Sequence, residues 1–474
     1  MVSVADAVGR LDALAASRPL VRISDAFAAA GRELALVGGP VRDAFLDRPL
    51  TDLDLATDAL PDDALAILKP LASTTWEIGR EFGTVGALID GQRVEVTTYR
   101  ADAYDGATRK PVVAFGDDLD ADLRRRDFTV NAMALRLPER VLVDPHGGLD
   151  DLLAGVLDTP AAPEVSFGDD PLRMMRAARF TAQLGFRVAD RVEAAMREMG
   201  PTLAIVSVER VADELGKLLL AADPVAGLRL LVETGIADLV LPELPALRLE
   251  ADEHAHHKDV YEHSLTVLTQ AIQLEAARMA DAVPDLPLRL AALLHDIGKP
   301  ATKRVDGRTV SFHHHDVVGA KLAAKRLRAL RFDNATIASV SRLIELHLRF
   351  FGYSDQPWTD SAIRRYVRDA GEELERLHIL TRADVTTRNR RKAERLDFAY
   401  DDLEHRIAEI AAAEGLAAVR PDLDGEAIMR LLDIRPGPDV GAAYKFLLDL
   451  RLDEGPLGAE EAGRRLREWW AARG

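Results

Sequence analysis

The sequence predicts an α+β protein, with an α/β head built on a small mixed sheet at the N-terminus and helical segments from there to the C-terminus. Short β-like runs separated by turn residues fill the first third of the chain. From about Asp150 onward, Ala, Leu, Arg and Glu at helical spacing dominate, so the remainder should be nearly all helix. At 474 residues, with 48% hydrophobic and 29% charged positions, the chain can form several hydrophobic cores.

Four β-like runs and one helical stretch define the head. The runs are LALVGG, DLDLAT, TVGALID and QRVEVTTY, and the helical stretch PDDALAILKPL follows the second of them. Asp90-Gly91 separates the last two runs and is a strong hairpin signal, so we expect those runs to be neighbouring antiparallel strands. These elements together predict one compact α/β domain.

Proline and glycine breaks divide the helical part of the chain. They occur at Gly200-Pro201, within residues 241–245 and at Arg420-Pro421. Together with the change of class near residue 150, they predict four domains, namely residues 1–150, 151–240, 241–400 and 401–474.

The composition restricts the class of protein. Because cysteine is absent, the chain can form neither disulfides nor zinc–thiolate sites, and a metal would need carboxylate or imidazole ligands. No run of about 20 apolar residues occurs, so we expect a cytoplasmic protein that does not enter a membrane. The net charge of -17 opposes nucleic-acid binding at long range. The basic residues nevertheless cluster, either as local positive surfaces or as solvated helix faces. The clusters comprise Arg124, Arg125, Arg126, Arg173, Arg176, Arg179, Arg388, Arg390, Arg391 and Lys392.

The segment GGPVRD follows the first β-like run and leads into a helix. Gly38 and Gly39 would let backbone N–H groups approach a phosphate closely, at the positive end of the helix dipole. Pro40 suits the first helical turn, and Arg42 would lie one turn from the phosphates as a mobile cation. Turns of this form are also common in α/β proteins that bind no phosphate.

Two carboxylates follow ten residues later. Asp52 and Asp54 alternate with leucines in a strand, so both should point to the same face and share one metal ion. Mg²⁺ prefers carboxylate oxygens and keeps positions open for substrate phosphates. Glu95 would add a third carboxylate if its strand lies beside the first two, while a turn or capping role for Asp52 and Asp54 remains the alternative.

These motifs resemble a known family. The series GGPVRD, TDLDLAT, EVTTYR, RRRDFTVNAMAL, DPLRMMRAARFTAQLGF and SVERVADELGKLLL is similar to class II CCA-adding tRNA nucleotidyltransferases and to the related bacterial poly(A) polymerases. The resemblance spans roughly residues 30–220. It implies a nucleotidyltransferase head in which Asp52 and Asp54 hold catalytic Mg²⁺, Glu95 assists, and Gly39, Arg42 and Arg126 contact the nucleotide.

A second pair of charged residues could select the base. Asp170 and Arg173 are three apart at an expected helix start, so a carboxylate acceptor would lie beside a guanidinium donor. Cytosine and adenine both present an amino donor beside a ring-nitrogen acceptor, whereas uracil and guanine would leave polar groups unpaired. The resemblance assigns the same role to this motif. Arg176 and Arg179 continue at spacing three, either toward a triphosphate or as a solvated helix face.

The segment between Arg100 and Arg124 resembles the flexible loop of family members that add the terminal A. Its presence favours addition of the complete CCA sequence from CTP and ATP to tRNA. A bacterial poly(A) polymerase is the first alternative, since it shares the head motifs. An HD-type phosphohydrolase with an RNA-binding head is the second.

The C-terminal half resembles the HD superfamily of metal-dependent phosphohydrolases. The resemblance rests on His263, on the pair His295-Asp296 and on Asp384. Two imidazoles and two carboxylates on different helices could converge on one divalent ion such as Ni²⁺ or Mn²⁺. His315 and His347 mark a possible second metal position. The resemblance therefore predicts a helical neck after the head, an HD-type helical body, and a helical tail that contacts tRNA.

Overall fold

The protein forms two compact units, which the computed structural model divides between Leu239 and Val240. The structure describes residues 4–49, 53–77, 79–101, 114–249, 259–279, 283–306, 309–350, 353, 358–387, 389–414 and 420–473. Asp52, Arg388 and the predicted flexible loop at residues 102–113 therefore lie outside the described residues. Each unit is considered by itself below.

A seven-stranded mixed sheet forms the centre of the head, in the order β3-β4-β5-β2-β1-β8-β9. Of its pairs, only β2 and β5 are parallel. The strands are β1 (Leu34–Val37), β2 (Leu53–Thr57), β3 (Thr74–Trp76), β4 (Thr84–Ile89), β5 (Gln92–Thr98), β8 (Ala134–Leu137) and β9 (Val141–Val143). The predicted α+β class and the hairpin at Asp90-Gly91 are thus confirmed. Strands β3, β8 and β9 are missing from the prediction because three or four residues give only a weak period, and none of them is followed directly by turn glycines as the equally short β1 is.

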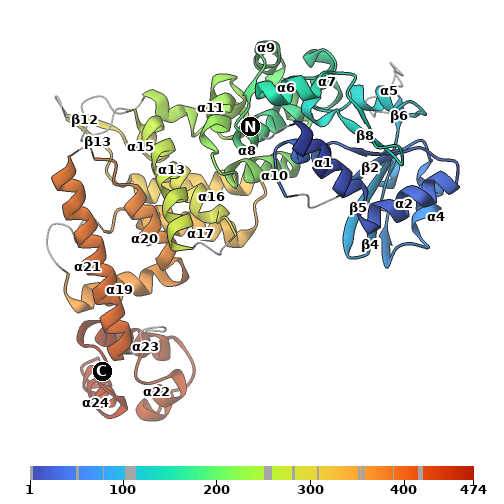
Figure 1. The fold of residues 1–474 in the computed structure, drawn as a ribbon. Coiled ribbons are helices and arrows are strands. Elements are labelled where there is room, and N and C mark those ends of the chain that lie inside the picture. The colour runs from blue at the N-terminus through green and yellow to red at the C-terminus, as the bar shows by residue number, and fades with distance from the viewer. Residues whose placement is uncertain are drawn as a thin grey trace. The chain divides into compact units, whose positions relative to one another are not determined.

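Helices cover the sheet and leave room for a site. Figure 1 shows α2 (Arg18–Ala29) and α4 (Pro61–Leu68) beside the strands, and α4 contacts both β4 and β5. Helix α3 (Gly39–Phe45) starts directly after β1, and α5 (Leu119–Arg124) packs on a core that includes Tyr99 and Leu123. The remaining elements of the head are α1 (Val4–Ala15), η1 (Arg80–Phe82), β6 (Arg100–Ala101), β7 (Ala114–Phe115) and η2 (Thr129–Asn131).

The rest of the first unit is mainly helical. Helix α8 (Arg173–Leu184) packs against both α10 (Val208–Leu219) and α11 (Val225–Glu233). The other elements are α6 (Gly148–Ala154), β10 (Val156–Leu157), α7 (Pro163–Asp169), β11 (Arg187–Val188), α9 (Asp190–Met199), η3 (Gly200–Ile205) and α12 (Ile236–Val240). The short parallel pair of β10 and β11 departs from the predicted run of helices.

The second unit is built around α14 (Leu286–Leu294), in which residues 288–294 are all buried. Helices α13 (Val260–Arg278) and α17 (Asn334–Leu346) pack on it, and α16 (His315–Ala329) packs on α17. The other helices are η4 (Pro245–Leu249), α15 (Lys299–Thr302), α19 (Asp360–Ala370), η5 (Gly371–Glu373), α20 (Leu374–Ala383), α21 (Arg390–Glu414), α22 (Gly425–Leu432), α23 (Pro438–Glu454) and α24 (Ala459–Ala471). A hairpin of β12 (Arg304–Asp306) and β13 (Thr309–Ser311) is again an exception to the all-helical expectation.

The predicted domain limits differ in how they meet these elements. The limit at 150/151 falls inside α6 and the limit at 400/401 falls inside α21, so a single helix continues through each of them. The limit at 240/241 coincides with the end of α12, next to the division between the two units. Among the described residues, no helix is both long enough and apolar enough to cross a membrane.

Candidate functional site

The turn after β1 is shaped by two glycines. Gly38 has a φ of 71°, a left-handed conformation that favours glycine, and it precedes α3 with Pro40 in the first turn. A Cβ atom at Gly38 would also lie 3.2 Å from Arg126 Nη1. Arg126 is held in this place by Asp122, 3.1 Å from its Nη2. The predicted turn is therefore present, and the Arg126 guanidinium lies over it.

Arg42 is buried, and the expectation that it is a mobile cation is wrong. Its Nη1 donates to Asn131 Oδ1 at 2.6 Å, and its Nε donates to Asp43 at 2.9 Å. The guanidinium also lies over the Phe180 ring, 5.3 Å from the centroid. Sequence reasoning placed Arg42 correctly beside the turn, but could not see the acceptor 89 residues away.

The predicted carboxylates lie in adjacent central strands. In the parallel ladder of β2 and β5, Asp54 is the direct partner of Glu95, so both side chains point to the same face of the sheet. Leu53 and Leu55 are buried on the opposite face. Asp54 lines the pocket described below, while Glu95 accepts from Arg93 Nη2 at 2.9 Å. Two carboxylates opposite each other on one face fit an oxygen-preferring cation such as Mg²⁺.

Asp170 and Arg173 share the pocket but are held by different partners. Helix α8 begins at Arg173, so Asp170 is extended and lies before the helix. Asp170 accepts from Arg210 Nη2 at 2.8 Å, whereas Arg173 donates to Ser166 Oγ and to the Arg125 carbonyl. Asp170 and Arg173 were expected to lie side by side on one helix face. Instead, each of the two side chains is fixed by hydrogen bonds to partners of its own.

Arg176 and Arg179 are bound to buried carboxylates rather than exposed on a solvated face. Arg176 donates to Asp127 at 2.8 Å through Nε, and Arg179 donates to Glu214 at 2.5 Å. Arg179 also stacks on Phe180, with its guanidinium carbon 4.1 Å from the ring centroid. Burial alone would raise the pKa of Asp127, but Arg176 and Asn131 hold that pKa well below its usual range.

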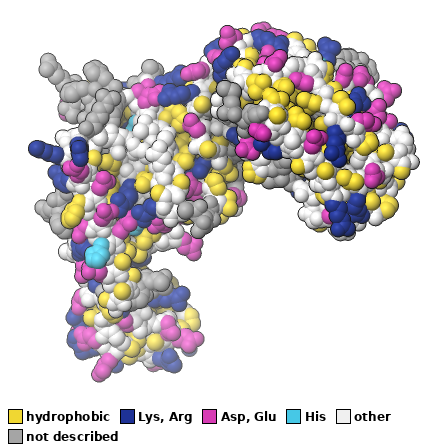
Figure 2. All heavy atoms as spheres, viewed as in Figure 1, with side chains coloured by type: hydrophobic (Ala, Val, Ile, Leu, Met, Phe, Trp, Pro, Cys, Tyr) yellow, Lys and Arg dark blue, Asp and Glu magenta, His cyan; other side chains and the backbone are white. Residues whose placement is uncertain are grey.

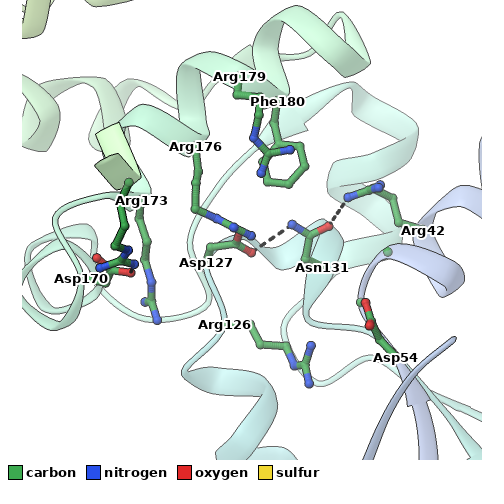
Figure 3. A pocket seen from close by; sticks show the side chains of 13 residues that line it. Arg42, Asp54, Arg126, Asp127, Asn131, Asp170, Arg173, Arg176, Arg179 and Phe180 are labelled. Atoms are coloured by element: carbon green, nitrogen blue, oxygen red, sulfur yellow. Dashed lines mark hydrogen bonds and ion pairs between the residues drawn. The ribbon is translucent and has the colours of Figure 1, made fainter. Parts of the chain in front are cut away.

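Most of these groups line one pocket of about 450 Å³ in the first unit, but Glu95 and Glu214 lie outside its lining. Its lining contains six arginines and three aspartates, so the pocket is locally positive although the chain carries a net charge of -17. Figure 3 shows Asp54 and Arg126 at one end and Asp170 and Arg173 at the other. The lining residues are Gly38, Gly39, Arg42, Asp54, Arg126, Asp127, Asn131, Asp170, Arg173, Arg176, Arg179, Phe180 and Arg210.

Four polar residues of this site were missed as individual residues. Asp127 and Asn131 lie within the motif RRRDFTVNAMAL, and Arg210 and Glu214 lie within SVERVADELGKLLL. Each contacts a predicted site arginine or aspartate rather than being an obvious ligand itself. Their presence in these motifs was a signal that could have identified them. Their contacts, however, are with residues distant in the sequence, and residue spacing does not predict such contacts.

The second unit holds a cluster of four histidines and two aspartates. One group of potential ligand atoms comes from His263, His295 and Asp384, and a second from Asp296, His315 and His347. Within each group the atoms lie within 4.8 Å of one another. The predicted convergence of these residues, including the additional His315 and His347, is therefore present in the structure.

Backbone carbonyls fix the orientation of three histidines of this cluster. The Nδ1 atoms of His295, His315 and His347 lie 2.6 to 2.9 Å from the backbone carbonyl three residues earlier. Each Nε2 is thereby directed inward, which is how metal-binding histidines are commonly fixed. The buried His347 Nε2 has no hydrogen-bond partner in the structure. An orphaned imidazole nitrogen beside carboxylates fits a divalent metal ion.

The pKa values of His295 and His347, the two most buried histidines of the cluster, shift in opposite directions. Burial lowers the pKa of His347 to about 4, and the charge of His295 acts in the same direction. Burial also acts to lower the pKa of His295, but the Asp296 and Asp384 carboxylates outweigh it and raise that pKa to about 10. A divalent metal ion bound here would supply positive charge to the same two carboxylates that raise the pKa of His295.

Three family profiles match successive parts of the chain. Residues 34–158 match the Poly A polymerase head domain, residues 185–247 match the probable RNA and SrmB-binding site of polymerase A, and residues 260–389 match the HD domain. An A-adding tRNA nucleotidyltransferase of Deinococcus radiodurans is 36% identical over 445 residues, covering 92% of this chain and 95% of that protein. The chain belongs to the tRNA nucleotidyltransferase family.

Other tRNA nucleotidyltransferases are similar over different lengths. The CCA-adding enzyme of Geobacillus stearothermophilus is 36% identical over 282 residues, which cover 57% of this chain and 68% of that protein. The crystal structure of the Bacillus stearothermophilus CCA-adding enzyme in complex with CTP superposes with a TM-score of 0.68 at 25% identity, covering 96% of this chain and 99% of that one. A Thermotoga maritima CCA-adding enzyme complexed with tRNA shares the fold, with a TM-score of 0.61 and 18% identity over 98% of both chains.

Proposed function

We propose that this tRNA nucleotidyltransferase adds CCA to the 3′ end of tRNA, using CTP and ATP and releasing pyrophosphate. The observation that carries the proposal is a single positive pocket that holds Asp54 at one end and the pair Asp170 and Arg173 at the other. The first end suits phosphoryl chemistry, and the second suits recognition of a base. The absence of cysteine fits the reducing cytoplasm, where we propose that the reaction takes place.

The arginines bind and orient the triphosphate. Arg42 and Arg126 lie beside the glycine turn and place positive charge where the phosphates would sit. Asp52 and Asp54 would hold Mg²⁺, with Glu95 beside them, and the bound metal would lower the pKa of the attacking 3′-hydroxyl and neutralise the charge of the leaving pyrophosphate. The tRNA hydroxyl attacks the α-phosphorus directly, so no protein nucleophile is needed.

Asp170 and Arg173 would select the base. The Asp170 carboxylate accepts from the amino group of C or A, and the Arg173 guanidinium donates to the neighbouring ring nitrogen. Arg210, Ser166 and the Arg125 carbonyl hold the two side chains in place. Because those supports are already formed, U and G would meet like polar groups that could not easily rearrange.

Nucleotide incorporation would test this proposal. Purified protein is incubated with Mg²⁺ and a tRNA ending at its discriminator base, with CTP, ATP, UTP or GTP separately and with CTP and ATP together. We expect two C additions from CTP alone and a complete CCA from the mixture. Addition of A alone, as the name of the Deinococcus radiodurans relative describes, would overturn the proposal, as would long A runs or no incorporation.

The variant Arg173→Ala tests the assignment of base selection. We expect it to lose discrimination against UTP and GTP by about tenfold or more, since each base-specific hydrogen bond to a charged group contributes roughly 1.5 to 3 kcal/mol. Triphosphate affinity, measured with pyrophosphate as competitor, should change much less. Unchanged base choice would contradict the assignment.

For the second unit we propose a metal-dependent phosphohydrolase site that binds a divalent transition metal such as Ni²⁺ or Mn²⁺. Support comes from the inward-facing imidazoles and from the orphaned His347 Nε2. Hydrolysis of a 2′,3′-cyclic phosphate in the presence of either metal, compared between the wild type and His295→Ala, would test it. If neither metal binds, measured by elemental analysis, the proposal fails.

A further inference from the structure

A row of four residues crosses one face of the head sheet and leads away from the pocket. Asp54 is paired with Glu95, Glu95 with Gly86, and Gly86 with Trp76. Directly opposed residues on neighbouring strands point to the same face, so the row runs from the pocket along β2, β5 and β4 to the edge strand β3 (Figure 1).

Trp76 lies across Gly86. A Cβ atom at position 86 would be 2.0 Å from the indole Nε1 and Cε2, so only glycine leaves space for the ring. The indole reaches past β4 to Arg93, whose guanidinium carbon lies 5.1 Å from the ring centroid. Arg93 in turn binds Glu95 at 2.9 Å, and its side chain is 61% exposed. The row therefore ends in an aromatic and cationic pair connected to the carboxylates.

The RNA substrate must reach Asp54 from outside the nucleotide pocket. The incoming nucleotide would occupy the cavity between Asp54 and Asp170, so the RNA end has to approach over another part of the head. The face that carries Glu95, Gly86 and Trp76 continues directly from Asp54. Three strand spacings of about 4.8 Å separate Trp76 from Asp54, roughly 14 Å in all. Stacked nucleotides rise about 3.4 Å each, so about four of them cover this distance.

We propose that Trp76 and Arg93 bind the 3′ end of the RNA substrate, with one of its last few bases stacked on this pair. The inference rests on the proposed function, which requires an RNA 3′-hydroxyl at Asp54. Stacking on an aromatic or guanidinium plane tolerates any base. Such tolerance is needed here, because the RNA end changes from the discriminator base to C and then to a second C during one round of addition. Arg93 adds positive charge for the backbone.

Steady-state kinetics with the full-length protein would test this role. Trp76→Ala and Arg93→Ala are compared with the wild type, using a tRNA lacking CCA as the varied substrate and then CTP as the varied substrate. We expect Trp76→Ala to raise the KM for tRNA about tenfold, within the range known for losing one base–aromatic stack. The KM for CTP should remain within about twofold. Arg93→Lys keeps the charge but loses the planar group, and should fall between the wild type and Arg93→Ala.

Two further variants separate binding from folding. Trp76→Phe retains an aromatic face over Gly86 and should recover most of the tRNA affinity. Val141→Ala removes an exposed apolar side chain from β9, at the other edge of the same sheet, and should leave both KM values unchanged. An unchanged KM for tRNA in both Trp76→Ala and Arg93→Ala, in a wild-type protein that does add nucleotides, would overturn this inference alone. A wild type that adds nothing would overturn the proposed function instead.

Discussion

Asn131 connects the two sides of the nucleotide pocket through one amide group. Its Oδ1 accepts from Arg42 at 2.6 Å, and its Nδ2 donates to Asp127 at 2.9 Å (Figure 3). Asp127 also binds Arg176 of α8. Since a side-chain amide offers an acceptor oxygen and a donor nitrogen on separate atoms, Asn131 can hold a cation on one side and a carboxylate on the other.

Replacing Asn131 by Ala would remove one of the supports of Arg42, leaving Asp43 and the Phe180 ring. A hydrogen bond to a charged group contributes about 1.5 to 3 kcal/mol, so we expect the KM for CTP and ATP to rise about tenfold or more. Initial rates at varied nucleotide concentration provide the measurement. Asn334→Ala, at an exposed position at the start of α17, serves as the control, and equal KM values in the two variants would contradict the role of Asn131.

At the scale of single residues, some arrangements could be predicted from the neighbouring sequence and others could not. The common face of Asp54 and Glu95 follows from strand alternation and a hairpin signal, which are local. The burial of Arg42 and the separate supports of Asp170 and Arg173 depend in part on partners 40 or more residues away. Residue types and spacing cannot encode such contacts, so sequence reasoning found the groups but not their arrangement.

At the scale of elements, α10 supports the pocket from behind α8. Arg210 and Glu214 are four residues apart and so lie on one face of α10. Arg210 holds Asp170, and Glu214 holds Arg179 and lies 3.7 Å from Arg176. The side chain of Glu214 is only 4% exposed. One helix thus fixes both Asp170 and two arginines of α8.

Removing the Glu214 carboxylate should therefore destabilise the first unit. Glu214→Ala leaves a buried Arg179 without its counter-charge, which costs about 3 to 5 kcal/mol in comparable cases. Asp213→Ala breaks only the exposed pair with Lys217 on the same helix, and should change the free energy of unfolding by less than about 0.5 kcal/mol. Urea unfolding of both variants measures the difference, and similar losses would refute the burial argument.

Helix α20 carries a buried histidine away from the metal cluster. His378 stacks on Tyr366 and has Glu404 at 3.6 Å, with Glu375, Arg278 and Arg382 also acting on it. Burial lowers the pKa of His378 below its usual 6.5, although the two glutamates oppose this. The unfolded chain therefore binds a proton more readily than the folded one, and stability falls as pH decreases below about 6.5.

His378→Phe should remove this acid sensitivity. Between pH 7.5 and 5.5 we expect the wild type to lose at most about 1.4 kcal/mol more than the variant, because one proton is involved. Tryptophan fluorescence can follow unfolding, since Trp358 lies 5.4 Å from the Tyr366 ring. His405→Phe, at a position 72% exposed, should keep the wild-type pH dependence. Parallel curves for the wild type and His378→Phe would contradict the prediction.

For the whole molecule, charge is distributed unevenly. On the face drawn in Figure 2, Lys and Arg side chains form small groups among Asp and Glu side chains. The nucleotide pocket concentrates six arginines, while the rest of the chain is acidic enough for a net charge of -17. Local concentration of positive charge can attract an anionic substrate to one place without making the whole protein bind nucleic acid unspecifically.

We expect a substitution in one unit to leave the activity or metal binding of the other unit unchanged. His295→Ala removes a proposed metal ligand from the second unit and should reduce bound Ni²⁺ or Mn²⁺ at least tenfold, while CCA addition stays within about twofold of the wild type. Asp54→Ala should abolish nucleotide addition and leave metal binding by the histidine cluster unchanged. Elemental analysis and incorporation assays on both variants check this. Loss of both properties in either variant would contradict separate chemistry.

The division of the chain into a mixed head and a helical remainder was predictable from sequence, because the spacing of apolar residues changes there. The change from strands to helices near residue 150 follows from patterns within a few residues, and the order of the proposed metal ligands follows from the resemblance to the HD superfamily. The limits predicted at 150/151 and 400/401 instead fall inside α6 and α21, because helical composition continues through them. The division of a helical chain depends on packing, which periodicity alone does not specify.

The position of β1 has a consequence for synthesis of the chain. β1 pairs with β2 on one side and with β8, residues 134–137, on the other. A nascent chain that has not yet reached β8 therefore exposes one edge of β1, with unpaired backbone groups that invite aggregation. The head sheet can be completed only after β8 and β9, which end at residue 143 of 474, have been synthesised, so premature termination upstream of β8 yields an aggregation-prone fragment rather than a smaller enzyme.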